Sequence, residues 1–295
     1  MWPNIKPYIY VLPTAGVLLI LFVGGLIEGL IQSLGYFPAA GQYGFSLDYY
    51  RQLLSSSDFW DSLILTFRIA LLSSLSAGVL GMFVSVCLFM LKRPGSGRKN
   101  QIWQRFFQLP LIVPHLVWAY LMVLLFTQSG WLSRILASLG WIHHINDFPV
   151  LVNDSFGGDI IFTYAWKEAP FIALMIYPVL LRIHGSWFEA SRVFGANRWS
   201  FFREILLPLL MPTWISSSFI VFAFTFSAFE VPFLLGVTYP RMLPVLSYNL
   251  YTSGGLEARP EALAVNVILA VIVSILGVAA YRLSQRWSMD EQGGW

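Results

Sequence analysis

Charged residues are scarce in this sequence. Asp, Glu, Lys and Arg together make 11% of the 295 residues, less than half of their share in soluble globular domains, whereas hydrophobic residues make 57%. Apolar runs of the length that crosses a bilayer, about 20 residues each, begin near Tyr8, Ser62, Leu109, Asp159, Thr213 and Leu263. The sequence therefore predicts an all-α, polytopic membrane protein, with six transmembrane helices that form a single domain over residues 1–295.

Cysteine is almost absent as well. The single Cys87 lies inside the second apolar run, which excludes a disulfide framework and a cysteine-based metal site. The histidines, His115, His143, His144 and His184, form no His-Glu-x-x-His arrangement. His143 and His144 are adjacent, so their side chains would point about 100° apart on a helix. We expect interfacial histidines without a metal, and the sequence does not favour a membrane enzyme.

Three further absences narrow the function. Gly95-Ser96-Gly97-Arg98-Lys99 lacks the spacing of a nucleotide-binding P-loop and its Ser or Thr after the lysine, so another chain must hydrolyse any nucleotide. The basic residues are spread over short loops and form no stripe with interleaved aromatics, which argues against nucleic acid. An internal repeat and a ladder of carboxylates are missing too, and a secondary transporter would be expected to have both.

Lysine and arginine are unevenly distributed between the loops. If the N-terminus is cytoplasmic, the inner segments hold twelve of the eighteen, namely Lys6, Lys92, Arg93, Arg98, Lys99, Arg105, Arg182, Arg192, Arg198, Arg203, Arg282 and Arg286. The outer loops hold only Arg51, Arg134, Arg241 and Arg259. This bias follows the positive-inside rule, so we expect both termini to be cytoplasmic.

One stretch between the apolar runs is too short and too polar to span the membrane. It covers residues 131–148 and contains Trp131 and Trp141. Tryptophan is enriched at the boundary between lipid and water. We therefore expect an interfacial helix over these residues on the outer face, with both tryptophans at headgroup depth.

The segment between the fourth and fifth predicted helices, residues 183–212, carries the most informative pattern. It contains Glu189-Ala190-Ser191, then Gly195-Ala196, then Ile205-Leu206-Leu207-Pro208. This pattern resembles the EAA motif in the permease subunits of type I, binding-protein-dependent ABC importers. The motif has an acidic-small-small triplet, a glycine six residues after the acid, and Ile-x-Leu-Pro ten residues beyond the glycine. The one departure is Ser191, which replaces the usual second alanine by another small residue.

The resemblance implies a coupling helix that docks on a separate ABC ATPase subunit. The coupling residues would be Glu189, Ala190, Ser191, Gly195, Ala196, Ile205, Leu207 and Pro208. It further implies a sister or identical permease subunit, a solute-binding protein on the periplasmic or extracellular side, and a place in the bacterial cytoplasmic (inner) membrane. ATP and Mg would be bound by the ATPase, with no cofactor and no catalytic residue on this chain.

The composition of the same segment agrees with a docking element. It holds more large apolar side chains than a solvated loop would expose, namely Trp187, Phe188, Val193, Phe194, Trp199, Phe201 and Phe202. We expect a helix-turn-helix in which Gly195 has a positive φ that ends the first helix. The alternative is an amphipathic helix pair whose aromatic side chains rest in the lipid headgroups.

A few ionisable residues fall inside the apolar runs, where a charge is costly and marks a functional site by default. For Arg68, Lys167 and Glu168 we expect a structural charge network. Glu230 differs, because the nearby Pro232 loosens the helix and frees a carbonyl, as is common in helices that line a cavity. We therefore predict a translocation path that includes Glu230, Glu168, Trp166 and Phe229.

The last third of the chain bears on the solute. Residues 229–236, Tyr239-Pro240-Arg241-Met242-Leu243-Pro244 and Arg259-Pro260-Glu261-Ala262 resemble the polyamine and ferric-iron branch of these permeases. A carboxylate among aromatic rings suits an organic ammonium ion, through charge pairing and cation–π attraction. A polyamine of the spermidine or putrescine kind is the first candidate. Ferric iron, a phosphonate and a zwitterionic amine are the alternatives.

Overall fold

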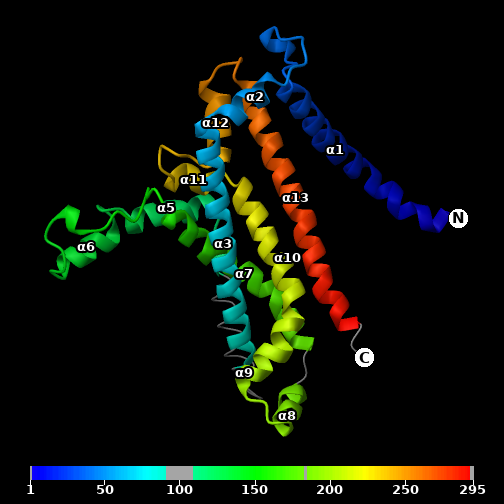
Figure 1. Ribbon diagram of the computed structural model, residues 1–295, viewed down its shortest axis with the longest axis vertical. Helices are drawn as coiled ribbons and strands as arrows, with labels where there is room; N and C mark the ends of the chain where they lie inside the picture. Colours follow the sequence, from blue (N-terminus) through cyan, green and yellow to red (C-terminus); the bar gives the residue numbers. More distant parts are fainter. Residues whose placement is uncertain (1, 91–108, 183–184, 293–295) are drawn as a thin grey trace. The chain divides into compact units, whose positions relative to one another are not determined.

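The computed structural model describes residues 2–90, 109–182 and 185–292, and most of these residues are helical (Figure 1). The helices are α1 (Trp2–Ser33), α2 (Asp48–Ser55), α3 (Ser57–Met90), α5 (His115–Phe126), α6 (Trp131–Ser138), α7 (Gly158–Arg182), α8 (Gly185–Val193), α9 (Arg198–Phe201), α10 (Leu207–Ser227), α11 (Glu230–Leu235), α12 (Leu243–Ser253) and α13 (Arg259–Gln292). Short 3₁₀ turns lie at Pro38–Ala40 (η1) and Ile145–Asp147 (η2), and a π-helical turn lies at Phe202–Leu206 (η3). The expectation of an all-α protein is confirmed.

The described residues contain five or six candidate membrane spans, where the sequence predicted six. Among the described residues, five stretches are long and apolar enough to cross a bilayer, namely Tyr10–Ser33, Ser57–Met90, His115–Ser138, Arg198–Ser227 and Arg259–Arg286. α7 is a sixth only when it is counted together with residues 187–193, at a bend of 64°. α7 alone is less apolar than the other spans because it contains the charged residues Lys167 and Glu168. The loop from Lys92 to Lys99, which supports part of the predicted orientation, lies outside the described residues.

The chain forms two compact units. The first comprises residues 1–60 and 243–271. Within it, Ser247 Oγ of α12 donates a hydrogen bond to the Ala262 carbonyl oxygen of α13 at 3.0 Å, and the Arg259 guanidinium lies over the Tyr251 ring, 4.7 Å from its centroid. The most apolar window of 18 residues in α1 has no buried residue. A helix that is apolar on all sides needs lipid or another subunit around it.

The second unit, residues 61–242 and 272–295, contains all the predicted functional residues. Glycines let α3 approach its neighbours closely there. A Cβ added to Gly81 would lie 2.7 Å from the Ala169 carbonyl oxygen of α7, and one added to Gly78 would lie 3.0 Å from Trp214 Nε1 of α10. Small residues at such crossings allow helices to pack tightly without a hydrophobic driving force between them.

Two apolar cores stabilise the second unit. One joins α5, α7 and α11 and includes Ala119, Ile160, Tyr164, Val231 and Leu235. The other joins α3, α7, α10 and the segment predicted to couple, and includes Ala77, Ile172, Phe201, Leu206 and Leu210. Because Phe201 and Leu206 belong to this second core, the coupling segment has a fixed place on the membrane helices.

The third predicted helix is interrupted. Residues 109–112 are helical, Pro114 has left the helix with φ −56° and ψ 147°, and α5 begins at His115. A proline disfavours the helical conformation of the residue before it, which accounts for the break at Val113. α5 is consequently only 12 residues long.

The stretch predicted to form an interfacial helix, residues 131–148, is helical over fewer residues than expected, and α6 belongs to the candidate span His115–Ser138. Only α6, from Trp131 to Ser138, is helical, and Gly140 with φ 73° redirects the chain directly after it. The rest of the stretch is irregular apart from η2, where Asp147 accepts hydrogen bonds from the N–H groups of His143 (2.9 Å) and His144 (2.8 Å). These bonds stabilise the carboxylate and hold the pKa of Asp147 below its usual range.

Candidate coupling hairpin and translocation path

α8, α9 and η3 form a hairpin whose turn is built by backbone hydrogen bonds. At the end of α8, the Ala196 N–H donates to the Ser191 carbonyl (3.0 Å) and the Gly195 N–H donates to the Arg192 carbonyl (2.9 Å). This pair of bonds is a Schellman motif, which requires a left-handed residue at the position of Gly195. Gly195 has φ 83°. The positive φ predicted for Gly195 is confirmed.

The second arm of the hairpin starts with a capped helix. Asn197 Oδ1 accepts a hydrogen bond from the Ser200 N–H at 2.8 Å, the usual side-chain cap at a helix N-terminus. The Schellman motif and this cap lie only two residues apart. Together they satisfy backbone groups on both sides of the turn, so the reversal between the two arms is determined by local sequence.

The large apolar side chains of the hairpin fall into two groups. Phe201 is 2% exposed and belongs to the same core as Phe188. Val193, Phe194 and Trp199 lie next to the turn and are 84%, 90% and 65% exposed. In Figure 1 this turn lies beyond the N-terminal end of α10. An exposed apolar cluster of this kind needs a covering partner or a lipid surface.

The acidic-small-small triplet lies on α8. Glu189 and Ala190 are exposed, whereas Ser191 is half-buried and donates its hydroxyl to the Phe188 carbonyl oxygen at 2.8 Å. Ala196, after the turn, is half-buried. The triplet, Gly195 and Ala196 therefore share one hairpin, and Glu189 presents its carboxylate on the surface of that hairpin.

The Ile-x-Leu-Pro part of the pattern lies where η3 passes into α10. Ile205 is half-buried against the second core, and Leu207 is the first residue of α10. The Leu207 N–H donates to the Phe202 carbonyl, five residues back, while Pro208 has no N–H to donate to Glu204. Pro208 thus favours the wider π turn before it and fits the first turn of α10.

Glu230 stands where the fifth predicted helix breaks. α10 ends at Ser227, Ala228 is extended with ψ 138°, and α11 begins at Glu230. The break precedes Glu230 because Pro232 fits the first turn of α11, where its missing N–H costs nothing. Glu230 is exposed in this single chain, and within the described ranges it forms no ion pair with a basic residue.

The other candidates for the translocation path lie in different surroundings. The Phe229 ring lies 4.8 Å from that of Phe233, one turn along α11. Glu168 is 8% exposed, whereas Trp166 is 45% exposed. Residues two positions apart in the sequence, such as these, point about 200° apart around the axis of an α-helix. α7 therefore presents Trp166 and Glu168 on opposite sides, and only Glu168 faces the interior of the unit.

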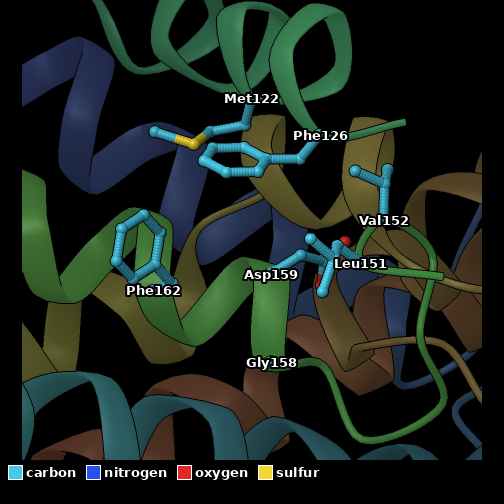
Figure 2. A pocket seen from close by; sticks show the side chains of 7 residues that line it. All are labelled: Met122, Phe126, Leu151, Val152, Gly158, Asp159 and Phe162. Carbon is cyan, nitrogen blue, oxygen red and sulfur yellow. The ribbon is translucent and has the colours of Figure 1, made fainter. Parts of the chain in front are cut away.

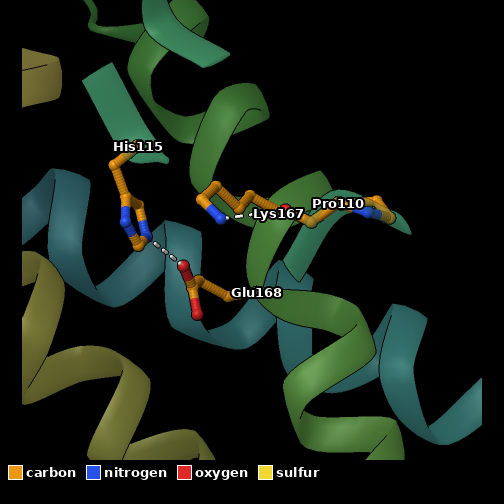
Figure 3. A network of polar contacts seen from close by, with 4 residues as sticks. All are labelled: Pro110, His115, Lys167 and Glu168. Atoms are coloured by element: carbon orange, nitrogen blue, oxygen red, sulfur yellow. Dashed lines mark hydrogen bonds and ion pairs between the residues drawn. The ribbon is translucent and has the colours of Figure 1, made fainter. Parts of the chain in front are cut away.

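Arg68, Lys167 and Glu168 do not form the expected network of mutual ion pairs. Figure 3 shows Lys167 Nζ donating to the Pro110 carbonyl oxygen at 2.9 Å and Glu168 Oε1 paired with His115 Nε2 at 2.7 Å. Arg68 donates to a backbone carbonyl in the loop before α7, at 3.1 Å. His115 was expected at an interface, and it instead contacts a buried carboxylate. Each charge has its own partner, and two of these partners are backbone oxygens.

Tyr164 was missed by the sequence analysis. It lies one turn before Glu168 on α7, is fully buried, and its ring centroid lies 6.4 Å from that of His115 and 6.2 Å from that of Phe224. Its hydroxyl is within electrostatic range of both Glu230 and Glu168, and it has no hydrogen-bond partner among the described residues. The structure thus brings Glu168 and the break at Glu230 into one region. Tyr164 could have been found from the sequence, because it lies four residues before Glu168 and therefore on the same face of the helix.

Residues 77–289, more than two-thirds of the chain, match the sequence profile of the family described as binding-protein-dependent transport system inner membrane component. The chain belongs to this family of permeases. The permease is therefore a multi-pass inner-membrane subunit of an ABC importer, not an enzyme.

The permease is similar to several transport permeases over nearly its whole length. It is 24% identical to the probable starch degradation products transport system permease protein AmyD of Thermoanaerobacterium thermosulfurigenes, covering 96% of this chain and 95% of AmyD. It is 23% identical to the putative 2-aminoethylphosphonate transport system permease protein PhnU of Salmonella typhimurium, covering 95% and 93%. A chain of a bacterial ABC transporter involved in the import of alginate has a TM-score of 0.78 to the permease at 22% identity, covering 97% and 98%. This structural likeness confirms the fold.

The permease also has a cavity of about 220 Å³ between α5, the loop before α7, and the start of α7 (Figure 2). It is lined by Met122, Phe126, Leu151, Val152, Gly158, Asp159 and Phe162. The Asp159 carboxylate is its polar group and already accepts hydrogen bonds from the N–H groups of Asn153 (2.9 Å) and Ile160 (2.7 Å). None of the four predicted path residues lines this cavity.

Proposed function

We propose that the hairpin of α8, α9 and η3 couples the permease to an ABC ATPase subunit. The observation that carries this proposal is the exposed cluster of Val193, Phe194 and Trp199 beside a turn that two local motifs hold rigid. ATP and Mg would be bound by the ATPase, and the permease itself would hold no cofactor. A second permease subunit, identical or homologous, and a periplasmic or extracellular solute-binding protein would complete the importer.

The coupling role is tested with two charge reversals on the hairpin. Glu189→Lys changes the exposed carboxylate of the triplet, and Glu204→Lys changes an exposed carboxylate of η3 outside it. We expect both variants to insert normally, and only Glu189→Lys to lose retention of the ATPase subunit during purification and solute-stimulated ATP hydrolysis. Full stimulated hydrolysis in Glu189→Lys would show that the triplet does not couple.

We propose further that Glu230 faces the translocation path and that the solute carries an ammonium group. Support comes from the position of Glu230 at a helix break, where irregular backbone inside a membrane is tolerated beside a water-filled cavity. Its carboxylate has no basic partner in the described part of the chain, so its charge is available to a cation. A polyamine is the first candidate, and 2-aminoethylphosphonate, for which PhnU is named, also carries an ammonium group.

The path is tested with Glu230→Gln, which removes the charge and keeps the size of the side chain. Uptake of putrescine, spermidine and 2-aminoethylphosphonate is measured in proteoliposomes that contain the complete importer. We expect a loss of about tenfold or more, as for a charged hydrogen bond worth 1.5 to 3 kcal/mol, with unchanged assembly. The control is Glu257→Gln, which removes an exposed carboxylate in the loop before α13. Uptake at the wild-type rate by Glu230→Gln would refute the role of Glu230.

An oligosaccharide is the second candidate solute. AmyD and the alginate transporter are both named for carbohydrates. The rings of Trp166 and Phe233 are 45% and 50% exposed, and aromatic faces of this kind present large amphipathic surfaces to a ligand. If maltotriose or an alginate oligosaccharide is taken up, Trp166→Ala should lower its uptake while Glu230→Gln leaves it unchanged.

A further inference from the structure

The break in the third membrane helix leaves a specific backbone oxygen without its usual partner. In an unbroken helix the N–H of residue 114 would donate to the carbonyl of residue 110. Residue 114 is a proline, which has no N–H, and its ψ of 147° takes the chain out of the helix. The Pro110 carbonyl therefore needs another donor, because a backbone oxygen buried without a partner is destabilising.

Lys167 provides that donor. Its Nζ lies 2.9 Å from the Pro110 carbonyl oxygen, and the residue is 2% exposed. A buried ammonium group is costly unless it is hydrogen-bonded, and so is a buried carbonyl. The hydrogen bond between them thus offsets part of the cost of burying each group.

Glu168 contacts the chain on the other side of the same break. His115 is the first residue of α5, directly after Pro114, and its Nε2 lies 2.7 Å from Glu168 Oε1. Consecutive residues of α7 therefore reach the end of one helical segment and the start of the next, as Figure 3 shows. Lys167 is nine residues from the start of α7, or about 14 Å along the helix axis. This length of helix is about half the thickness of a hydrocarbon core of about 30 Å.

We propose that Lys167 and Glu168 are positioning residues that hold the third helix open at Pro114 and thereby place α5 for transport. α5 packs against α11 in the first apolar core, through Ala119 on one side and Val231 on the other. α11 begins with Glu230. In this proposal a change in the break at Pro114 reaches Glu230 through α5 and α11, and Glu168, which the sequence placed on the path, acts through His115 and not directly on the solute.

The proposal is tested by a double-mutant cycle between Lys167 and Pro114. Lys167→Met removes the ammonium group and keeps most of the stem, and Pro114→Ala restores an N–H that can donate to the Pro110 carbonyl. The thermal midpoint and the solute uptake per ATP hydrolysed are measured for the assembled importer. Lys167→Arg keeps a cationic donor and is the conservative control.

We expect Lys167→Met to lower both the midpoint and the uptake per ATP, the latter by about tenfold, and Lys167→Arg to recover most of both. The double variant Lys167→Met/Pro114→Ala should have the same thermal midpoint as Pro114→Ala alone. Its uptake per ATP should stay below that of the wild type, because the helix then closes across the break. If Lys167→Met does not assemble, recovery of assembly in the double variant carries the same information. Two outcomes would overturn the proposal. One is wild-type uptake per ATP in Lys167→Met. The other is that Lys167→Met lowers the thermal midpoint equally with Pro114 and with Pro114→Ala.

Glu168 has its own pair of variants. Glu168→Gln can still hydrogen-bond His115 and should keep uptake per ATP within about twofold, whereas Glu168→Leu should lose it about tenfold. Equal uptake in the two variants contradicts a positioning role. The proposal rests on the proposed path only through Glu230. If Glu230→Gln transports normally, the path is refuted. The thermal midpoints of the Lys167 and Pro114 variants still test the contact between these residues, because that measurement does not involve Glu230.

Discussion

The rings of Phe188 and Phe201 meet edge to face, with centroids 5.1 Å apart and planes inclined by 68°. Phe188 comes from the first arm of the hairpin and Phe201 from the second, so this contact ties the arms together. Edge-to-face pairs are a favourable geometry for aromatic rings. The hairpin thus has a small core of its own that is continuous with the core of the membrane helices.

This contact predicts different outcomes for two phenylalanines of one hairpin. Phe201→Ala should destabilise the permease by about 3 to 5 kcal/mol, as is usual for a buried phenylalanine. Phe194→Ala should leave stability unchanged, since Phe194 is 90% exposed, but should weaken retention of the ATPase. Thermal midpoints and co-purification with the ATPase separate the two effects. Loss of stability in Phe194→Ala would place that ring in the core instead.

The turn itself can be tested at Gly195. A Cβ added there would meet no atom within 4 Å, so any penalty must come from the backbone conformation. A left-handed conformation costs an ordinary L-residue about 1 to 2 kcal/mol, more for a β-branched residue and less for asparagine. We expect Gly195→Val to lose solute-stimulated ATP hydrolysis and Gly195→Asn to keep most of it. Equal activities would mean that the left-handed turn is not required for coupling.

The predicted orientation is tested with single cysteines in a Cys87→Ser background. Val193 is 84% exposed beside the turn, and Ser155 is exposed in the loop before α7. With an impermeant maleimide applied to intact cells lacking an outer membrane, Ser155→Cys should be labelled, and Val193→Cys only after the membrane is opened. Lys99→Cys extends the test to the loop outside the described residues. Labelling of Val193→Cys from outside would reverse the topology and exclude ATPase docking.

The crossing of α3 and α7 predicts a steric effect at Gly81. The Cβ of an alanine there would lie 2.7 Å from the Ala169 carbonyl oxygen and 2.9 Å from Ile172 Cβ, closer than normal contact. Overpacking of this kind costs about 1 to 3 kcal/mol, so Gly81→Ala should lower the thermal midpoint. Gly24→Ala in α1 is the matched control, because its Cβ would meet no atom within 4 Å. Equal midpoints for the two variants would show that α3 and α7 are less tightly packed.

The hairpin could be predicted from sequence because its signals are local. A positive φ at Gly195 follows from a glycine between two short apolar segments, and Asn197 supplies a cap two residues later. The start of α11 was less predictable. Pro232 indicated a disturbed helix, but the chain breaks at Ala228, because a proline is accommodated in a first turn more easily than in a helix interior.

The break at Pro114 and its polar contacts could not be predicted in the same way. Pro110 and Pro114 stand four residues apart within an apolar run, and hydropathy alone does not distinguish a kink from a break. The choice depends on whether another element supplies the missing donor. Lys167 does so from a helix that begins 44 residues after Pro114 in the sequence, and no local pattern connects the two.

The contact between Lys167 and Pro110 has a consequence for the evolutionary record of this family. Its acceptor is a main-chain oxygen, and every amino acid at position 110 would provide one. Substitutions at 110 and 167 therefore need not compensate each other, and we expect these two positions not to covary among relatives. The positions that should be gained and lost together among relatives are 114 and 167, since a proline at 114 creates the need that a lysine at 167 fills.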